Sequence, residues 1–287
     1  MNPTPYQILV SVQQLQDMTA AGQQVLLIDC SFDLSNTDAG HSAYLSAHLP
    51  GAHYLHLDCD LSGPKTDETG RFRGRHPLPD RADFARRMAA LGLRDGLQVV
   101  AYDAQGGMYA ARLWWMLRWL GHANAAVLDG GAQAWAVAGL GLSDAVPTAQ
   151  MGDFEPTDSL VSSLTATELQ ARLGQIRLID ARAPERFRGE VEPLDARAGH
   201  IPGASNRLFR NNLQSDGRFK PATKLRAEFA ALLAPQPATK VVHQCGSGVT
   251  ACHNLLAMEY AGLGGSALYP GSWSEWSADP ARPVAKG

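Results

Sequence analysis

The sequence has few cysteines, no long apolar run and no strong excess of either charge. Its 287 residues include four cysteines, 25 Lys or Arg and 28 Asp or Glu, which give a formal net charge of −3. That balance offers no electrostatic reason to expect nucleic acid or an anionic membrane surface as a partner. The longest apolar candidate, residues 113–120, is interrupted by Arg118 and is much shorter than the roughly 20 residues of a membrane span. We therefore expect no membrane segment.

The four cysteines, Cys30, Cys59, Cys245 and Cys252, form no C-x-x-C pair and are too sparse for a disulfide scaffold. The first six residues lack the basic segment and apolar core of a signal peptide. The histidines show no metal-ligand spacing with the cysteines or with one another, so we expect neither a metal nor a cofactor. These absences predict a cytoplasmic protein in a reducing setting.

Four landmarks recur in the same order in the two halves of the chain. Residues 26–30 correspond to 177–181, 47–52 to 199–204, 99–103 to 241–245, and 128–131 to 268–271. This recurrence predicts a duplicated domain. Each half alternates short apolar strands with helical stretches, which indicates an α/β fold with a mostly parallel sheet flanked by helices on both faces.

A stretch rich in Pro, Gly, Ser and Asp, residues 143–163, separates the two predicted domains, 1–142 and 164–287. Asp80 is a predicted cap for a helix through Phe84 and Met88. Thr165 and Glu168 form a capping-box pattern that predicts the first helix of the second domain. The domains differ at one important position, because Asp103 in the first corresponds to Cys245 in the second. We expect residues 1–142 to be non-catalytic and 164–287 to be catalytic.

The residues around Cys245 predict a strand, a tight loop and a helix. Residues 240–243 are mostly apolar and β-branched, and apolar residues recur at helical spacing from Val249 onward. The small residues 246–248 allow several backbone N–H groups to point at the sulfur. These donors and the helix N-terminus favour an anion, so we expect Cys245 to be a thiolate nucleophile. A small buried structural cysteine is the alternative interpretation.

The loop excludes one class of cysteine enzyme. Cysteine-dependent phosphatases need an arginine six residues after the nucleophile to hold phosphate oxygens, and this position is Ala251. No charged side chain lies between Cys245 and Ala251. We therefore expect a cradle of neutral donors, suited to a small or singly charged group on sulfur.

The chain resembles the two-domain rhodanese family over nearly its whole length. The resemblance is carried by residues 48–52 and 200–204, 114–116, 128–131, 245–251 and 269–276. It implies two tandem rhodanese-like domains. In this family, Gly and Ser after the cysteine are typical of 3-mercaptopyruvate sulfurtransferases, whereas basic residues there are typical of thiosulfate sulfurtransferases. Gly246 and Ser247 therefore favour 3-mercaptopyruvate.

The resemblance also implies roles for individual residues. A relay that deprotonates the donor or the cysteine corresponds to Ser247, His76 and Asp58. The loop that holds the persulfide corresponds to Gly246, Gly248, Val249 and Thr250.

Arginines hold the donor carboxylate in this family, and Arg186 matches the first of them. The second is not at its usual place, because the family's Glu-Pro-Arg is Glu-Pro-Leu at residues 192–194. Arg197, shifted along the chain, and Arg112 are the further candidates.

The implied reaction moves sulfane sulfur from 3-mercaptopyruvate, a small-molecule donor, through a Cys245 persulfide, with release of pyruvate. The acceptor is a thiol such as thioredoxin, or cyanide. Thiosulfate:cyanide transfer is the nearest alternative. A partner-binding module without catalysis is another, but such modules typically lack the cysteine. A thiol-oxidation sensor would use Cys252 as resolving thiol, although a position seven residues along a helix should point away from Cys245.

Overall fold

The computed structural model describes residues 5–287 and divides into two compact units. The first unit comprises the chain up to Leu61, Pro79–Leu160 and Gln214–Phe219. The second comprises Ser62–Leu78, Val161–Leu213 and Lys220–Gly287. Each unit thus includes one segment from the opposite half of the sequence. The boundaries 1–142, 143–163 and 164–287 stay a prediction.

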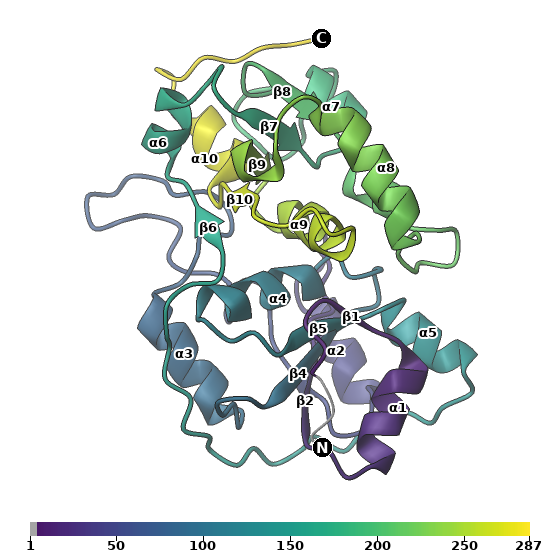
Figure 1. Ribbon diagram of the computed structural model, residues 1–287. Coiled ribbons are helices and arrows are strands. Elements are labelled where there is room, and N and C mark those ends of the chain that lie inside the picture. Colours follow the sequence, from purple (N-terminus) through teal and green to yellow (C-terminus); the bar gives the residue numbers. More distant parts are fainter. Residues whose placement is uncertain (1–4) are drawn as a thin grey trace. The chain divides into compact units, whose positions relative to one another are not determined.

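The first unit is built on a parallel sheet of five strands in the order β1-β5-β4-β2-β3 (Figure 1). Its strands are β1 (Leu9–Val10), β2 (Val25–Asp29), β3 (His53–Tyr54), β4 (Gln98–Tyr102) and β5 (Ala125–Leu128). Its helices are α1 (Val12–Ala20), α2 (Ala39–Ser46), α3 (Arg81–Ala90), α4 (Ala110–Trp119) and α5 (Gly131–Val137). Helices α1 and α5 contribute to a core with side chains of the strands. Figure 1 shows α3 and α4 across the sheet from them.

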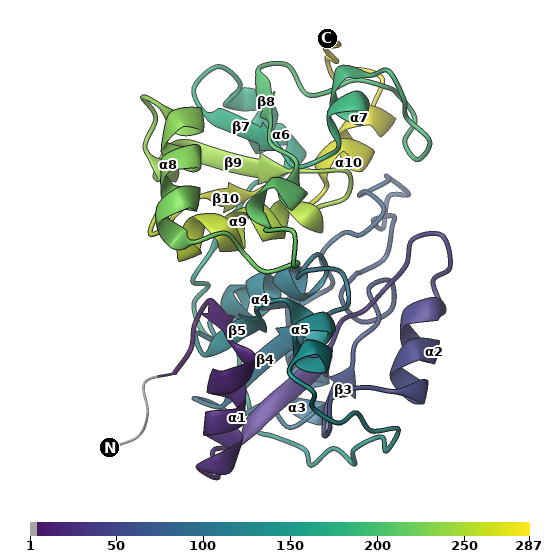
Figure 2. The same ribbon diagram turned by 90° about the vertical axis from the view of Figure 1, so that its right-hand side faces the viewer.

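The second unit repeats this design with the strand order β6-β10-β9-β7-β8, again wholly parallel (Figure 2). Its strands are β6 (Ser162–Ser163), β7 (Arg177–Asp180), β8 (Ala204–Asn206), β9 (Val241–Gln244) and β10 (Ala267–Leu268). Its α-helices are α6 (Ala166–Ala171), α7 (Pro184–Arg188), α8 (Ala222–Leu233), α9 (Thr250–Tyr260) and α10 (Ser272–Ala278). Two 3-10 turns are η1 (Phe209–Asn212) and η2 (Ala238–Lys240). Helices α6 and α10 share a buried core with strand residues, and Figure 2 shows α8 and α9 across the sheet.

The predicted helix caps are confirmed. Asp80 accepts hydrogen bonds from the N–H groups of Ala82 and Asp83, which start α3. Thr165 and Glu168 form the reciprocal capping box at the start of α6. Such caps pair donors that a helix would otherwise leave unsatisfied, so the sequence defines where these two helices begin.

The central strands have the same register in both units. Ala101 and Tyr102 of β4 lie opposite Ile28 and Asp29, and His243 and Gln244 of β9 lie opposite Ile179 and Asp180. The predicted duplicated α/β fold is confirmed. Asp103 and Cys245 therefore follow equivalent strands at their carboxyl ends, where parallel sheets commonly bind ligands.

The helices within residues 5–287 are short. The longest, α8, has 12 residues, and no helix in this range has the length and apolar character needed to cross a membrane.

Candidate active site

Cys245 is fixed on both sides by hydrogen bonds to the start of α10. Its N–H donates to Ser272 Oγ at 3.1 Å, and its carbonyl accepts from the Trp273 N–H at 3.0 Å. The side chain is 2% exposed, and its sulfur accepts the Gly248 N–H at 3.2 Å. The predicted order of strand, loop and helix is confirmed, since β9 ends at Gln244 and α9 begins at Thr250.

The loop after Cys245 has to be made of small residues. Gly248 has φ +80°, and a methyl group there would lie 2.2 Å from the Pro270 carbonyl oxygen. No side chain fits that space, and few would adopt that backbone conformation. The Gly246 carbonyl accepts the Ser274 N–H at 2.9 Å, which ties the loop to α10 as well. Close contact with the segment 270–274 thus shapes the cradle around the sulfur.

The structure brings Ser247 and His76 together within the second unit. His76 Nδ1 lies 2.7 Å from Ser247 Oγ, and both side chains are buried. The segment Ser62–Leu78 delivers His76 to the loop and is fixed there by the Arg75 N–H, which donates to Ser274 Oγ at 3.1 Å. A serine and a histidine in contact can pass a proton between them.

Two guanidinium groups lie beside the loop. A methyl group on Gly246 would be 2.8 Å from Arg75 Nη2 and 3.5 Å from Arg186 Nη1. The expectation that the cradle holds only neutral donors is therefore wrong. It counted the charges in the loop's own sequence, whereas these charges come from residues distant in the chain.

Carboxylates bridge these arginines. Asp195 accepts hydrogen bonds from Arg75 Nη1 and from Arg186 Nη2, the latter at 3.0 Å. Glu192 accepts from Arg186 Nη2 at 2.6 Å and from Arg182 Nη1 at 3.2 Å. Burial raises the pKa of the Asp195 carboxyl, and the charge of Arg75 opposes that rise.

Sequence reasoning missed Arg75 and Asp195. The signals were present, because Arg75 directly precedes His76, and Asp195 directly follows the segment 192–194 that departs from the family pattern.

Arg197 does not lie free to hold a substrate. Its guanidinium donates to four backbone carbonyl oxygens that follow or end α10. They belong to Trp276, Ser277, Asp279 and Arg282. A guanidinium occupied in this way holds the chain after α10 in place, so this geometry gives no support to the expected substrate contact.

Asp58 and Arg112 belong to the first unit. Asp58 lies between β3 and α3, and its N–H donates to His56 Nδ1 at 3.1 Å. Arg112 is a buried residue of α4 whose Nη2 donates to the Leu61 carbonyl at 3.4 Å. Their roles at Cys245 stay predictions.

The first unit has a closed loop where the second has its thiol. Both oxygens of the Asp103 carboxylate are occupied by backbone N–H groups of the following loop. These belong to Gln105, Gly107, Tyr109 and Ala110, at 2.7 to 2.9 Å. The loop thus binds its own carboxylate, and this half of the chain has no nucleophilic cysteine at the equivalent position.

None of the four cysteines forms a disulfide. Cys252 Sγ donates to the Gly248 carbonyl at 3.4 Å from its place on α9. In the described part of the chain, no three His, Cys, Asp or Glu side chains converge as metal ligands would.

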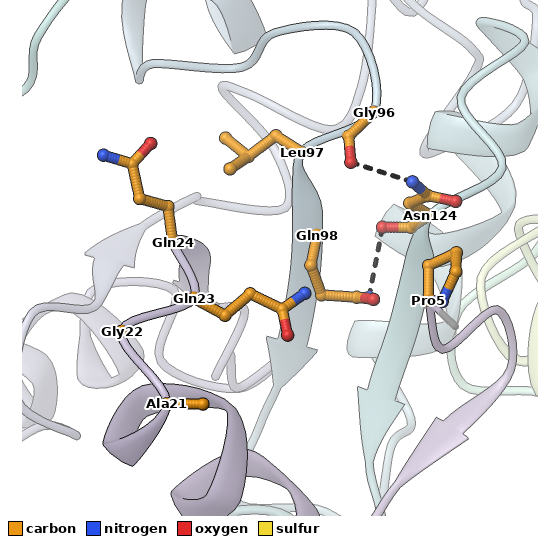
Figure 3. A pocket seen from close by; sticks show the side chains of 9 residues that line it. All are labelled: Pro5, Ala21, Gly22, Gln23, Gln24, Gly96, Leu97, Gln98 and Asn124. Atoms are coloured by element: carbon orange, nitrogen blue, oxygen red, sulfur yellow. Dashed lines mark hydrogen bonds between the residues drawn. The ribbon is translucent and has the colours of Figure 1, made fainter. Parts of the chain in front are cut away.

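A cavity of about 540 Å³ in the first unit lies at the opposite end of β4 from Asp103 (Figure 3). Its polar lining consists largely of carboxamides, and Asn124 Nδ2 donates to the Gly96 carbonyl while Gln98 Nε2 donates to the Asn124 carbonyl. None of the described residues lining it is titratable or nucleophilic. It therefore offers no group for sulfur chemistry.

Comparison with known proteins gives a consistent result. Residues 11–138 and 165–279 match the family model of the Rhodanese-like domain. A Pseudomonas aeruginosa protein named "Probable 3-mercaptopyruvate sulfurtransferase" is 48% identical over 282 residues, covering 97% of this chain and 98% of its own. The thiosulfate sulfurtransferase of Bos taurus is 33% identical over 300 residues, covering 98% and 96%. The solved 3-mercaptopyruvate sulfurtransferase from Leishmania major has a TM-score of 0.82 and 31% identity, covering 97% of this chain and 76% of its own.

Proposed function

This chain belongs to the rhodanese family, and we propose that it transfers sulfane sulfur from 3-mercaptopyruvate through a persulfide on Cys245. The observation that carries the proposal is the geometry at this cysteine. Its buried sulfur accepts the Gly248 N–H, and the neighbouring Ser247 lies 2.7 Å from His76. The nucleophile thus lies two residues from a serine that contacts a histidine, so a proton-transfer pair is next to it, as sulfur transfer from a thiol donor requires.

In the first step, the Cys245 thiolate attacks the sulfur of 3-mercaptopyruvate and forms a sulfur–sulfur bond. The carbon–sulfur bond of the donor breaks, and its electron pair goes to the methylene carbon. That carbon takes up the proton given up by the donor thiol and leaves as the methyl group of pyruvate. The N–H groups of the loop, which includes Gly246, Gly248, Val249 and Thr250, stabilise the negative charge on the outer sulfur.

In the second step, an acceptor attacks the outer sulfur and Cys245 leaves as a thiolate. The acceptor is a thiol, such as that of thioredoxin, or cyanide. Covalent storage of sulfur implies ping-pong kinetics. The four cysteines form no disulfide, which supports a reducing, cytoplasmic setting for this cycle.

The remaining roles follow from charge and proton transfer. Ser247 and His76 carry the donor proton, with Asp58 as the third member of the relay. Arg186 holds the donor carboxylate through its guanidinium, because this planar group binds carboxylates through two parallel hydrogen bonds. Arg112 is a further candidate for this contact.

Thiosulfate is the second candidate donor, and a specific observation favours it. The guanidinium groups of Arg75 and Arg186 lie beside Gly246, where they can attract a dianion. A comparison of kcat/KM for the two donors with cyanide as acceptor separates the candidates. A strong preference for thiosulfate would reverse our choice.

The decisive experiment is intact-mass measurement after incubation with 3-mercaptopyruvate. We expect the wild type to gain the mass of one sulfur atom and to release one equivalent of pyruvate. Cys245→Ser should gain none, whereas the matched control Cys252→Ser should gain as much as the wild type. A persulfide on Cys245→Ser would contradict the proposal, and a disulfide between Cys245 and Cys252 on mild oxidation of the wild type would revive the oxidation-sensor alternative.

The proton relay has its own test. Ser247→Ala and His76→Asn should lower turnover of 3-mercaptopyruvate by about 100-fold, a typical contribution of proton transfer. Turnover of thiosulfate should fall less, because this donor has no thiol proton to lose. Equal losses for both donors would mean that the pair supports the loop without moving a proton.

A further inference from the structure

Six charged side chains of the second unit form a chain of alternating sign. In order, they are Asp180, Arg182, Glu192, Arg186, Asp195 and Arg75. Arg182 is buried and binds both oxygens of Asp180, which fixes one end of the chain at β7. The other end is Arg75, beside Gly246. The charge network therefore leads from the sheet to the loop of the nucleophile.

The two arginines at the loop end of this charge network have hydrogen-bond donors without an acceptor in the described structure. Arg75 Nη1 donates to Asp195, while Nη2 would lie 2.8 Å from a methyl group placed on Gly246. Within the described residues, the Nε atoms of Arg75 and Arg186 are buried and have no hydrogen-bond acceptor. A guanidinium has five N–H donors and is suited to carboxylates and other oxyanions. These two arginines can thus bind another anion.

Asp195 is the group with which such an anion would compete. Its side chain is 3% exposed, and it contacts both arginines. The network contains three guanidinium groups and three carboxylates, so its formal charges balance. An additional anion at Gly246 would be attracted by Arg75 and Arg186 and repelled by Asp195. The burial that raises the pKa of Asp195 shows that its charge is poorly solvated.

We propose that Arg75 completes, with Arg186, an anion clamp for the head group of the sulfur donor, and that Asp195 limits its affinity by competing for the same guanidinium groups. This inference rests on the proposed function. The ligand chemistry is an anionic head group, which is the carboxylate of 3-mercaptopyruvate or the sulfonate end of thiosulfate. Arg75 and Asp195 are specificity-determining residues in this proposal, and Cys245 remains the nucleophile.

The origin of Arg75 explains how the site functions without an arginine at position 194. Leu194 occupies that place, and the next residue is the bridging Asp195. The segment Ser62–Leu78 supplies the second guanidinium instead, one residue before His76. One segment thus brings both a charge and a proton-transfer group to the Cys245 loop.

The test compares KM and kcat for both donors, with cyanide as acceptor, in five proteins. They are the wild type, Arg75→Ala, Arg75→Lys, Asp195→Asn and the control Arg188→Ala, which removes an exposed arginine of α7 paired with Glu190. Arg75→Ala should raise KM at least tenfold and change kcat less than threefold, as loss of a charge-assisted contact predicts. Arg75→Lys should recover part of the loss. Asp195→Asn should lower KM severalfold, and Arg188→Ala should match the wild type.

Contrary results are equally defined. If Arg75→Ala lowers kcat with an unchanged KM, Arg75 positions His76 and the clamp is refuted. If Asp195→Asn raises KM, Asp195 supports the arginines and the competition is refuted. If Arg75→Ala fails to fold, Arg75→Lys decides, because it keeps the charge without the planar fork and should still raise KM moderately.

A binding measurement separates this inference from the proposed function. Calorimetric titration of Cys245→Ser with thiosulfate reports on anion binding without any sulfur transfer. Affinity should fall about tenfold when Arg75→Ala is added and rise when Asp195→Asn is added. Failure of persulfide formation in the wild type would refute the proposed function and leave this result standing. Equal affinity in all three backgrounds would refute the clamp alone.

Discussion

The two units have the same fold and differ in what their central loop surrounds. In both, the residue after the central strand is fixed by the helix that follows the neighbouring strand, α5 or α10: Ala132 N–H donates to the Asp103 carbonyl at 3.1 Å, and Trp273 N–H to the Cys245 carbonyl at 3.0 Å. In the first unit the loop closes on the buried Asp103 carboxylate through four N–H groups. In the second it surrounds a thiol. The loop backbone is thus an anion-binding structure, and the side chain at its centre decides between a structural and a chemical use.

The starts of these two helices, α5 and α10, show a second difference. Gly131 of α5 and Ser272 of α10 have nearly the same left-handed conformation, with φ of 53° and 52°. Glycine adopts it at little cost, whereas serine is strained there. The serine hydroxyl accepts the Cys245 N–H, a contact that Gly131 cannot make for Asp103. The unit with the thiol thus combines backbone strain with an added contact at the nucleophile.

The largest effect on activity should come from giving the second loop the same central side chain as the first. Cys245→Asp places a carboxylate in the second loop, and we expect at least a 1,000-fold loss of sulfur transfer, because no sulfur remains to be carried. The protein should still fold, since the first unit shows that such a loop can close on a carboxylate. Intact mass and a thermal unfolding curve measure both outcomes. Unfolding of the second unit would show that its loop cannot accommodate the carboxylate.

The next largest effect concerns the first loop. Asp103→Asn keeps the shape of the side chain but turns an NH₂ group toward two of the four backbone donors. We expect a loss of about 2–6 kcal/mol in the free energy of unfolding, at about 1–3 kcal/mol for each of the two buried donors left unpaired. Urea denaturation measures it, and persulfide formation on Cys245 provides the functional control. A change below 1 kcal/mol would mean that the carboxylate contributes little to closing this loop.

Local and periodic features of the sequence were sufficient to predict the fold. The repeated landmarks gave the duplicated sheet, and the caps at Asp80 and Thr165 gave the starts of α3 and α6. The loop around Cys245 was predictable for the same reason, because glycine spacing has a direct consequence for the backbone.

Contacts between distant segments were beyond this reasoning without the family resemblance. That resemblance suggested His76 with Ser247, which the structure brings together. The resemblance assigned no role to Arg75, although Arg75 directly precedes His76, and only the path of the segment Ser62–Leu78 places its guanidinium beside Gly246. For Arg197, nearness in sequence to the expected position does not reveal the contacts of its guanidinium, which donates to four backbone carbonyls.

A smaller effect is the pH dependence of stability, which should differ between the central strands β4 and β9. His243 of β9 lies where β4 has Ala101, and its burial lowers its pKa to about 3. The unfolded chain takes up a proton near pH 6.5 and the folded chain does not, so stability is full above that pH and falls as pH decreases toward 3. Between pH 6.5 and pH 5 this loss is about 2 kcal/mol.

The matched variant for this prediction is His243→Leu, which cannot be protonated. Carboxylates in both proteins also respond to acid, so the quantity to compare is the difference between their unfolding free energies in urea at each pH. That difference should shift by about 2 kcal/mol in favour of the variant as pH falls from 6.5 to 5. A constant difference would show that water or a nearby acceptor relieves the buried imidazole.

The smallest effect concerns the strained residue at the start of α10. Ser272→Ala keeps the strain and removes the acceptor of the Cys245 N–H, whereas Ser272→Gly removes both, as in the first unit. Both variants lose the hydrogen bond, but only Ser272→Gly releases the strain. Ser272→Gly should therefore be more stable than Ser272→Ala by about 1 kcal/mol. Thermal unfolding of the two variants gives this difference. If Ser272→Ala is as stable as Ser272→Gly, the left-handed conformation is not strained, and the hydroxyl contact alone distinguishes the second unit from the first.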